Sequence, residues 1–408
     1  ILFLLGCIQQ KIGSKEKENE TQNKTKTASS DWPTSKCDSG RTGYNAGESV
    51  LRPPLVLKWT YVSPTSAGSR WSDVFEGISS VSGTVYVGVG MGDSLKVYAI
   101  DAASGSKNWE FILRENTSGA SMGSTPAISA GLVYFGGQGV DMLYALYAET
   151  GQRAWEFPGM ETMYGSHPLV VDGTVYAKGA GKLYALDART GAKRWELEVS
   201  GCGGNSPAIK DGTVYVVSDY HSYGVLYALD AGTGTVKWTS TCRRQYAYPL
   251  VSDGTVFIEA SDQTVKALDA GTGSVRWETT LQGHLPYLGE GTLAYAYHTL
   301  YATTSDPRWD APQEPVKVHA IDAATGSIKW VFDPGIEDLF LTPAVANGVV
   351  YVSSWRSGML YAINAMTGIE EWHQHHERRL TSPPIIANGV LYVAGDNTLY
   401  AYACNKTD

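Results

Sequence analysis

Short runs of alternating apolar and polar residues, separated by glycine-containing turns, fill most of the chain. The stretch Pro168-Leu-Val-Val-Asp-Gly-Thr-Val-Tyr176 is an example, with an Asp-Gly turn between two apolar runs. A period of two residues, interrupted by turn residues at short intervals, is typical of paired and partly buried β-strands. An Asp-Gly pair between such runs indicates a tight hairpin. The pattern therefore predicts an all-β fold built from consecutive hairpins.

A second hairpin phrase follows the first and recurs along the chain. It has the form Ala-x-Asp-x-x-Thr-Gly-x-x-x-Trp, and its seven copies end at Trp109, Trp155, Trp195, Trp238, Trp277, Trp330 and Trp372. The Asp side chain can bond the backbone beyond it, and the Gly can adopt positive φ. Intervals of 39 to 53 residues between these tryptophans match the period of a propeller blade. Two hairpins per interval predict a four-stranded antiparallel blade.

The two ends of the chain complete the ring. An eighth first hairpin, at residues 384–392, leads into the segment 399–402, and no further Thr-Gly-x-x-x-Trp follows it. The missing outer strand is supplied by residues 55–59, which end in an eighth tryptophan, Trp59. Pairing of the first and last segments leaves no open sheet edge. We therefore predict an eight-bladed β-propeller of four-stranded antiparallel blades, closed by an N-terminal strand that joins the C-terminal blade.

These repeats carry a family resemblance. The recurring phrase is similar to the tryptophan-docking motif of quinoprotein dehydrogenases and of the PQQ-repeat family that includes BamB, and the likeness covers residues 31–404. It implies eight blades, with each tryptophan packed between neighbouring blades. The opening segment 31–44 also resembles the lead-in of archaeal surface PQQ-repeat proteins. Tyr147 and Asn364 replace the turn Asp, and Ser104 replaces the Thr, so these turns are expected to be weaker.

The charge balance excludes one class of partner. The chain carries 41 acidic residues against 32 lysines and arginines, with a net charge of −9. Nucleic-acid binding normally requires a basic face that neutralises phosphates. We therefore expect no nucleic-acid partner.

The N-terminal residues predict a membrane-anchored protein outside the cytoplasm. Leu4-Leu-Gly-Cys7 resembles a lipoprotein lipobox, so residues 1–7 are interpreted as a signal remnant with lipidation at Cys7; an ordinary apolar terminus is the alternative. Residues 8–30 are polar and devoid of aromatics, which predicts a disordered stalk before a propeller domain at 31–408. Candidate glycosylation sequons start at Asn19, Asn23, Asn116 and Asn405.

The four remaining cysteines suggest two disulfides. Cys202 and Cys242 follow the tryptophans of consecutive blades, so both are expected in loops on one face. Cys37 precedes the borrowed strand, and Cys404 follows the strand that it joins. An even number of cysteines suits an oxidising exterior. We predict the pairs Cys202–Cys242 and Cys37–Cys404, with four buried free thiols as the alternative.

The family resemblance also raises an enzymatic alternative, a PQQ-dependent oxidoreductase. In the enzymes that the chain resembles, the quinone stacks on a disulfide between adjacent cysteines, beside a calcium ion. The chain has no adjacent cysteine pair, so neither PQQ nor calcium is expected, and we predict a non-enzyme. His373, His375 and His376 form a histidine cluster, but strand alternation puts only the first two on one face, so a solvated loop is the interpretation here and no metal site is predicted.

The loops that leave each tryptophan and enter the next innermost strand surround the mouth of the central channel. They are rich in aromatic residues and arginines, the residue types of binding hot spots. The candidate binding residues are Trp71, Tyr164, His167, Arg243, Arg244, Tyr246, Tyr248, His284, Phe340, Arg378 and Arg379. The alternative is that the tyrosines pack blade edges and the arginines pair with acids such as Glu337 or Asp338.

These features predict a non-catalytic, lipid-anchored propeller at the cell surface. Its partner would be another envelope protein or an extracellular polymer bound on that loop face. Two alternatives remain: the PQQ-dependent oxidoreductase, and a structural component of a surface layer or filament, which the stalk and the sequons suggest.

Overall fold

The computed structural model describes most of the chain from Ser30 onward. The described residues are 30–64, 73–90, 94–115, 124–137, 140–160, 167–179, 181–199, 206–220, 223–242, 247–261, 263–285, 291–304 and 315–405. Predictions for Cys7, the stalk, Asn19, Asn23 and Asn116 fall outside these residues. Asn405 lies within them and is exposed. In the described part of the chain, no helix is long and apolar enough to cross a membrane.

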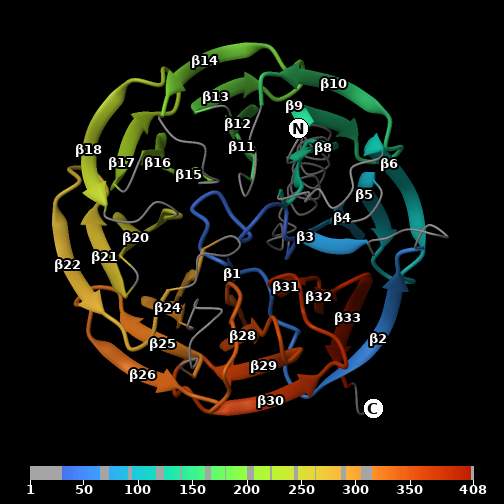
Figure 1. Ribbon diagram of the computed structural model, residues 1–408, viewed down its shortest axis with the longest axis vertical. Coiled ribbons are helices and arrows are strands. Elements are labelled where there is room, and N and C mark those ends of the chain that lie inside the picture. Colours follow the sequence, from blue (N-terminus) through green and yellow to red (C-terminus); the bar gives the residue numbers. More distant parts are fainter. Residues whose placement is uncertain are drawn as a thin grey trace, which may run out of the picture.

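Eight four-stranded antiparallel sheets surround a central axis, as predicted (Figure 1). Blade 1 consists of β3 (Val74–Val81), β4 (Thr84–Gly90), β5 (Ser94–Asp101) and β6 (Lys107–Glu115); blade 2 of β7 (Ala127–Ser129), β8 (Leu132–Gly137), β9 (Val140–Tyr147) and β10 (Arg153–Pro158); blade 3 of β11 (Leu169–Val171), β12 (Thr174–Gly179), β13 (Lys182–Asp187) and β14 (Lys193–Glu198); blade 4 of β15 (Ala208–Lys210), β16 (Thr213–Tyr220), β17 (Tyr223–Asp230) and β18 (Val236–Cys242).

The remaining blades repeat this order from the innermost to the outermost strand. Blade 5 consists of β19 (Leu250–Ser252), β20 (Thr255–Ser261), β21 (Thr264–Asp269) and β22 (Val275–Thr280); blade 6 of β23 (Leu293–Ala296), β24 (Thr299–Thr304), β25 (Lys317–Asp322) and β26 (Ile328–Phe332); blade 7 of β27 (Ala344–Ala346), β28 (Val349–Ser353), β29 (Met359–Asn364) and β30 (Glu370–His375); blade 8 of β31 (Ile385–Ala387), β32 (Val390–Gly395), β33 (Thr398–Cys404) and the N-terminal β2 (Leu55–Val62).

The ring closes between the two ends of the chain. Strand β2 pairs antiparallel with β33, in a register that places Leu55 opposite Cys404 and Tyr61 opposite Leu399. The first residues of the propeller thus provide the outermost strand of the last blade, and the predicted closure is confirmed.

Seven of the eight docking tryptophans hydrogen-bond to the next blade, as the family resemblance implies. Trp195, for example, donates its indole N–H to the carbonyl of Ala231 at 3.0 Å, and the hydroxyl of Tyr176 donates to the same oxygen. The indole lies against Gly234, where a Cβ would come within 2.7 Å of the ring. Indole-to-alanine bonds of this kind join Trp59 to Ala102, Trp109 to Ala148, Trp155 to Ala188, Trp238 to Ala270, Trp277 to Ala323 and Trp330 to Ala365.

The junction between blades 7 and 8 is different. Among the described residues, no backbone carbonyl accepts a hydrogen bond from the Trp372 indole, unlike the other seven docking tryptophans. The Trp372 ring instead meets Tyr402 edge-on, with ring centroids 6.1 Å apart. The buried hydroxyl of Tyr351, which stands where Tyr176 does in blade 3, finds no hydrogen-bond partner among the described residues. In the described part of this junction, the indole-to-carbonyl bond is thus replaced by a ring contact.

The turn aspartates of the docking hairpins accept hydrogen bonds from the residues that follow them in the turn. In blade 3, Asp187 Oδ1 accepts hydrogen bonds from the N–H and the hydroxyl of Thr190, and Oδ2 accepts one from Arg194 at 2.8 Å. Gly191 follows at φ 72°. In blade 7, where asparagine replaces the aspartate, Asn364 Oδ1 still accepts hydrogen bonds from the backbone N–H groups of Met366 and Thr367. The arginine and the turn donors lower the pKa of Asp187, and that of its counterpart Asp269, to about 2.

These lowered pKa values predict an acid-sensitive fold. A carboxylate whose folded pKa lies below its unfolded value of about 3.9 stabilises the fold above that value, and the contribution is lost as pH falls towards 2. We expect stability to fall between about pH 4 and pH 2, and the fall to be shallower in an Asp187→Asn/Asp269→Asn variant. Urea unfolding measured at several pH values would check this. Identical acid profiles for the variant and the natural chain would contradict it.

Residues 30–48, which we call the plug, fill the axis of the ring. Plug carbonyls accept hydrogen bonds from backbone N–H groups on the innermost strands of blades 2, 4, 5, 6 and 7: Pro33 from Ile128, Ser39 from Ile209, Gly40 from Val251, Thr42 from Tyr295 and Gly43 from Val345, at 2.6–2.8 Å. Trp32 pairs with Ser80 on β3, and the Asn45 amide donates to Ile386 on β31. Strand β1 (Tyr44–Asn45) pairs parallel with β27. The sequence did not predict this plug.

Two buried cations fasten the plug. Arg41 is 1% exposed and donates to the carbonyls of Pro207 at 2.6 Å, His167 at 2.9 Å and Ser35 at 3.3 Å. Lys36 is 2% exposed, and its ammonium donates to the carbonyl of Leu293 at 3.1 Å. Charge-assisted bonds to carbonyls satisfy these cations in the absence of water.

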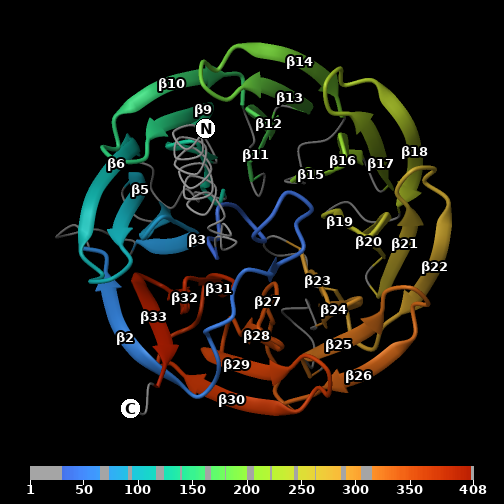
Figure 2. The same ribbon diagram turned by 180° about the vertical axis from the view of Figure 1, so that it is seen from behind.

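The chain leaves the axis after the plug and runs outward to β2 (Figure 2). On the way, the Asn347 amide donates to the carbonyls of Ser49 and Leu51. Asn347 lies in the turn between β27 and β28, the first and second strands of blade 7. The side of the ring that carries this turn and its counterparts in the other blades is called the hairpin face. The opposite side, which we call the loop face, carries the connections from each outermost strand to the next innermost strand.

This path corrects one prediction, because the Cys37–Cys404 disulfide is not formed. Cys37 lies in the plug, and its thiol points to the carbonyl of Asp31 at 3.9 Å. Cys404 lies at the end of β33, with its thiol 3.1 Å from the carbonyl of Val50. Both are free thiols. The sequence interpretation placed Cys37 directly before β2, whereas the intervening residues lead from the axis to the rim. Cys202 lies outside the described residues, so its pairing with Cys242 stays a prediction.

Candidate functional site

The predicted binding residues on the loop face separate into three groups. Trp71, Tyr164, Arg243, Arg244 and Tyr246 lie outside the described residues. Three of the others are buried, namely His167, Tyr248 and Phe340. The remaining described ones reach the surface: Arg378 and Arg379 are exposed, and His284 is partly so.

His167 serves the structure of the ring. Its Nδ1 accepts a hydrogen bond from the N–H of Thr125 at 2.7 Å, and its own N–H donates to Ser206 Oγ at 2.8 Å. Its carbonyl receives the Arg41 guanidinium. His167 therefore links three blades and the plug, and a partner on the surface does not reach it.

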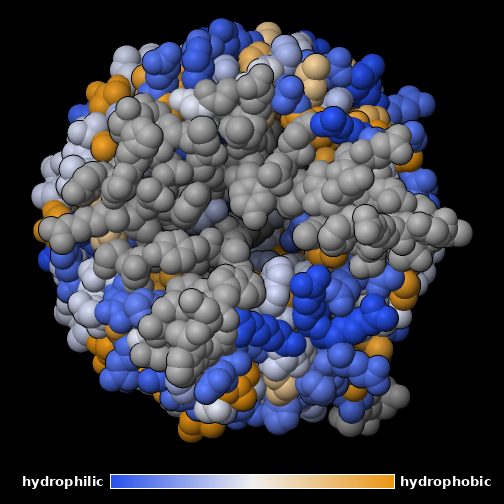
Figure 3. Space-filling view, in the orientation of Figure 1, coloured by the Kyte–Doolittle hydropathy of each residue, from blue (hydrophilic) through white to orange (hydrophobic). Residues whose placement is uncertain are grey.

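Arg379 is part of an ordered platform on blades 7 and 8. Its Nε donates to Asp396 Oδ1 at 2.6 Å, and its guanidinium lies over the Trp355 ring, 5.3 Å from the centroid. Arg356, Glu377 and Arg378 are exposed beside it. We call Trp355, Arg356, Arg378 and Arg379 the loop-face platform. Hydrophilic residues gather over these two blades (Figure 3).

Asp338 holds the turn that carries Trp355. The buried Asp338 Oδ1 accepts hydrogen bonds from the N–H groups of Leu339 at 2.6 Å and Arg356 at 2.8 Å, and its Oδ2 accepts from the N–H and hydroxyl of Ser357. The sequence interpretation considered Asp338 as a partner for arginine side chains, whereas these bonds come from backbone N–H groups and a serine hydroxyl. The sequence interpretation did not include Trp355 among the binding residues. The one sign that could have found it is that this tryptophan lies outside the recurring docking phrase.

Two of the three histidines after the last docking tryptophan, His373 and His376, have different partners. His373 Nδ1 lies 2.6 Å from Glu370 Oε1 at the surface, whereas His376 is buried between the Gly358 carbonyl and the Tyr402 hydroxyl. Burial lowers the pKa of His376. No group of three or more His, Cys, Asp or Glu side chains in the described ranges is arranged to hold a metal ion.

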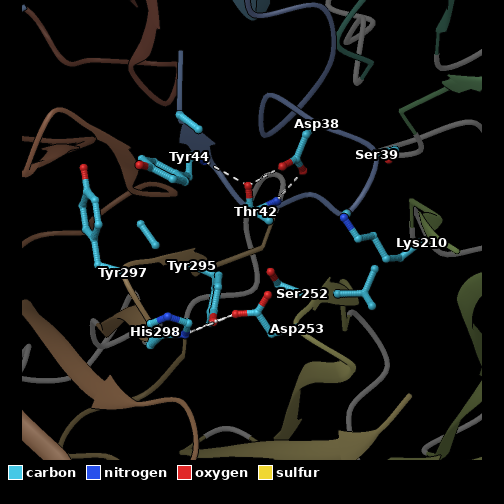
Figure 4. A pocket seen from close by; sticks show the side chains of 14 residues that line it. Asp38, Ser39, Thr42, Tyr44, Lys210, Ser252, Asp253, Tyr295, Tyr297 and His298 are labelled. Atoms are coloured by element: carbon cyan, nitrogen blue, oxygen red, sulfur yellow. Dashed lines mark hydrogen bonds and ion pairs between the residues drawn. The ribbon is translucent and has the colours of Figure 1, made fainter. Parts of the chain in front are cut away.

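A pocket of about 340 Å³ opens on the hairpin face between the plug and blades 5 and 6. Figure 4 shows Asp38, Ser39, Thr42 and Tyr44 of the plug along one edge, and Ser252, Asp253, Tyr295 and His298 along the other. Lys210 and Tyr297 stand at the two ends. No residue of this pocket was among the sequence predictions.

Hydrogen bonds within the pocket walls fix its carboxylates. Asp38 accepts from the N–H of Thr42 at 2.9 Å and from its hydroxyl at 2.6 Å, and burial raises the pKa of Asp38. Tyr295 donates its hydroxyl to Asp253 Oδ2, and His298 Nδ1 lies 3.3 Å from the same oxygen. The pocket therefore presents acidic and basic side chains together, beside three tyrosines.

Comparison with known proteins places the repeats in one family. The family described as outer membrane protein assembly factor BamB matches residues 58–207, 201–331 and 313–407. A quinohemoprotein alcohol dehydrogenase of Comamonas testosteroni is 40% identical over 68 residues, which is 14% of this chain and 10% of that protein. The chain thus spans about a tenth of the length of this curated relative.

Solved structures show the same fold at low sequence identity. A europium-containing methanol dehydrogenase superposes with a TM-score of 0.72 at 14% identity, covering 92% of this chain and 98% of that one. BamB from Moraxella catarrhalis gives 0.64 at 17% identity, with coverages of 87% and 99%. The Comamonas testosteroni quinohemoprotein alcohol dehydrogenase gives 0.70 at 17% identity, with coverages of 93% and 81%. Both an assembly factor and dehydrogenases therefore share this ring.

Two features of the chain differ from the quinone site that the dehydrogenase resemblance implies. The sequence has no two adjacent cysteines on which a quinone could stack. The axis of the ring is filled by the plug, and the side chains of Lys36 and Arg41 bond backbone carbonyls there.

Proposed function

This chain belongs to the PQQ-repeat family described as outer membrane protein assembly factor BamB, and we propose that it is a non-catalytic binding scaffold at the cell envelope. Its partner is an acidic segment of an envelope protein, or an anionic extracellular polymer, bound on the loop face. The lipidation proposed for Cys7 and the stalk at 8–30 tether the ring outside the cytoplasm. The observation that carries the proposal is the loop-face platform.

The platform has the composition and order of a binding hot spot. Trp355 and Arg379 are already held by stacking and by Asp396, so little side-chain freedom remains to be lost when a partner binds. Aromatic residues and arginines supply most of the energy in protein interfaces. Three arginines stand here, Arg379 paired with Asp396 and Arg356 and Arg378 exposed with Glu377, on a chain with a net charge of −9. That contrast favours an anionic partner and steers it to this face.

The experiment is quantitative affinity capture from native membranes with the intact chain as bait. We expect an Arg378→Glu/Arg379→Glu variant to recover its specific partner at least about tenfold less well, because two attractive charges become repulsive. The matched control is Lys58→Glu/Arg189→Glu, which changes the net charge equally at exposed residues away from the platform. The control should capture the partner normally.

Two results would contradict the proposal. Equal loss of capture in both charge-reversed variants would assign the effect to net charge and not to the platform. Dye reduction with an alcohol, after PQQ and calcium are added to the purified chain, would favour the oxidoreductase, to which the likeness with the methanol dehydrogenase points.

A further inference from the structure

We propose that the hairpin-face pocket binds a neutral saccharide of one or two rings. The inference concerns the face opposite the loop-face platform and does not rest on the proposed function. It comes from an exception in the repeat, from the mixed chemistry of the pocket and from the size of the pocket.

The exception is the turn between the first two strands of blade 6. In the seven other blades this turn ends in glycine at positive φ: Ser82-Gly83, Ala130-Gly131, Asp172-Gly173, Asp211-Gly212, Asp253-Gly254, Asn347-Gly348 and Asn388-Gly389. In blade 6 the pair is Tyr297-His298, at φ 51° and 52°. Positive φ favours glycine and disfavours bulky side chains. Backbone strain of this kind tends to be kept where side chains have a function.

Packing of the ring does not account for His298. At Gly83, Gly131, Gly173 and Gly212, the equivalent positions, an added Cβ would meet no atom within 4 Å. The His298 side chain is 87% exposed and contacts Asp253 and Tyr295 on the pocket wall. Tyr297 does have a packing role, since its hydroxyl accepts the N–H of Gly348 and its ring meets Tyr44 edge-on at 5.1 Å. Both side chains line the pocket.

The charges of the pocket favour a neutral ligand. A small anion would meet the carboxylates of Asp38 and Asp253, and a small cation would meet Lys210 and His298. A saccharide avoids both conflicts, because each hydroxyl both donates and accepts hydrogen bonds. Tyr44, Tyr295 and Tyr297 supply apolar ring surface with polar tips, which suits the C–H face and hydroxyls of a sugar.

The volume is consistent with this ligand class. Small-molecule sites are concave and measure roughly 300–1,000 Å³, with a few convergent polar groups. The pocket, at about 340 Å³, is at the lower end of that range and has room for a sugar unit, not for a folded partner.

The test uses the full chain and saturation-transfer NMR with glucose, galactose, mannose, N-acetylglucosamine, N-acetylgalactosamine and their β-1,4-linked disaccharides. Glucuronic acid and glucosamine serve as charged comparators. We expect at least one neutral sugar to receive saturation. Its affinity should fall at least about tenfold in a Tyr297→Asn/His298→Gly variant, which restores the turn used by the other blades.

A His298→Gly single variant separates binding from folding, because it keeps the contacts of Tyr297 with Gly348 and Tyr44 and restores the glycine of the other seven blades. It should keep its melting temperature and show a reduced affinity for the sugar. The matched control is Asp172→Tyr/Gly173→His, which places the same pair in the turn of blade 3. It should melt at a lower temperature and bind the sugar unchanged. Loop-face variants should also bind normally.

Three outcomes overturn the proposal. The first is no saturation transfer from any neutral sugar at millimolar concentration, and the second is preferential binding of a charged comparator. The third is undiminished sugar binding by the Tyr297→Asn/His298→Gly variant. A marked drop in its melting temperature without sugar binding by the natural chain would make the tyrosine–histidine pair purely structural.

Discussion

Replacing Arg41 with alanine is expected to lower the free energy of unfolding by about 3–5 kcal/mol. The guanidinium is fully buried on the axis and bonds three backbone carbonyls, from Ser35, His167 and Pro207. Alanine leaves these carbonyls without that donor, and each buried polar group that loses its hydrogen bond costs about 1–3 kcal/mol. Urea unfolding followed by tryptophan fluorescence would measure the change.

Two further substitutions serve as comparisons for the loss of stability in Arg41→Ala. Arg189→Ala removes an exposed arginine and should change stability by no more than about 0.5 kcal/mol. Arg41→Lys keeps the charge but cannot reach three carbonyls at once, so an intermediate loss is expected. If Arg41→Ala proved as mild as Arg189→Ala, the plug would not be needed to hold the ring together.

Replacing Trp195 with alanine is expected to cost a similar amount, about 3–5 kcal/mol, through a different mechanism. The indole covers Gly234 of the next blade and bonds the Ala231 carbonyl, so its loss opens a cavity between blades 3 and 4. Trp195→Phe keeps most of the packing and loses the hydrogen bond, which should cost about 1 kcal/mol.

Trp372 provides an internal control for this effect. It occupies the same position in blade 7, but among the described residues its indole meets the Tyr402 ring and no backbone carbonyl accepts its N–H. Trp372→Ala should therefore destabilise the protein less than Trp195→Ala when both are compared by urea unfolding. Equal losses would show that the docking turn adds nothing beyond burial of the ring.

The blades were predictable because their signals are local. The turn residues Asp187, Thr190 and Gly191 lie within five positions of one another, and they fix the docking hairpin wherever the phrase recurs. Trp195 contacts the corresponding hairpin one repeat later, so its role follows from the period.

The binding residues were less predictable because burial depends on the whole ring. His167, Tyr248 and Phe340 have the side chains of a binding surface, but neighbouring blades and the plug cover them. Trp355 joins the platform through tertiary contacts, because Asp338 fixes its turn and Arg379 stacks on its ring.

Four features were predictable from residue types repeated at short spacing: the number of blades, their four-stranded pattern, the docking tryptophans and the borrowing of β2. Only the tertiary structure revealed the plug, the free state of Cys37 and Cys404, and the pocket beside Tyr297 and His298. The plug is held mainly by its backbone carbonyls, which every residue type possesses, and its partners lie up to hundreds of positions away. Such contacts leave no pattern in the chain, and they exist only once eight blades have closed around an axis.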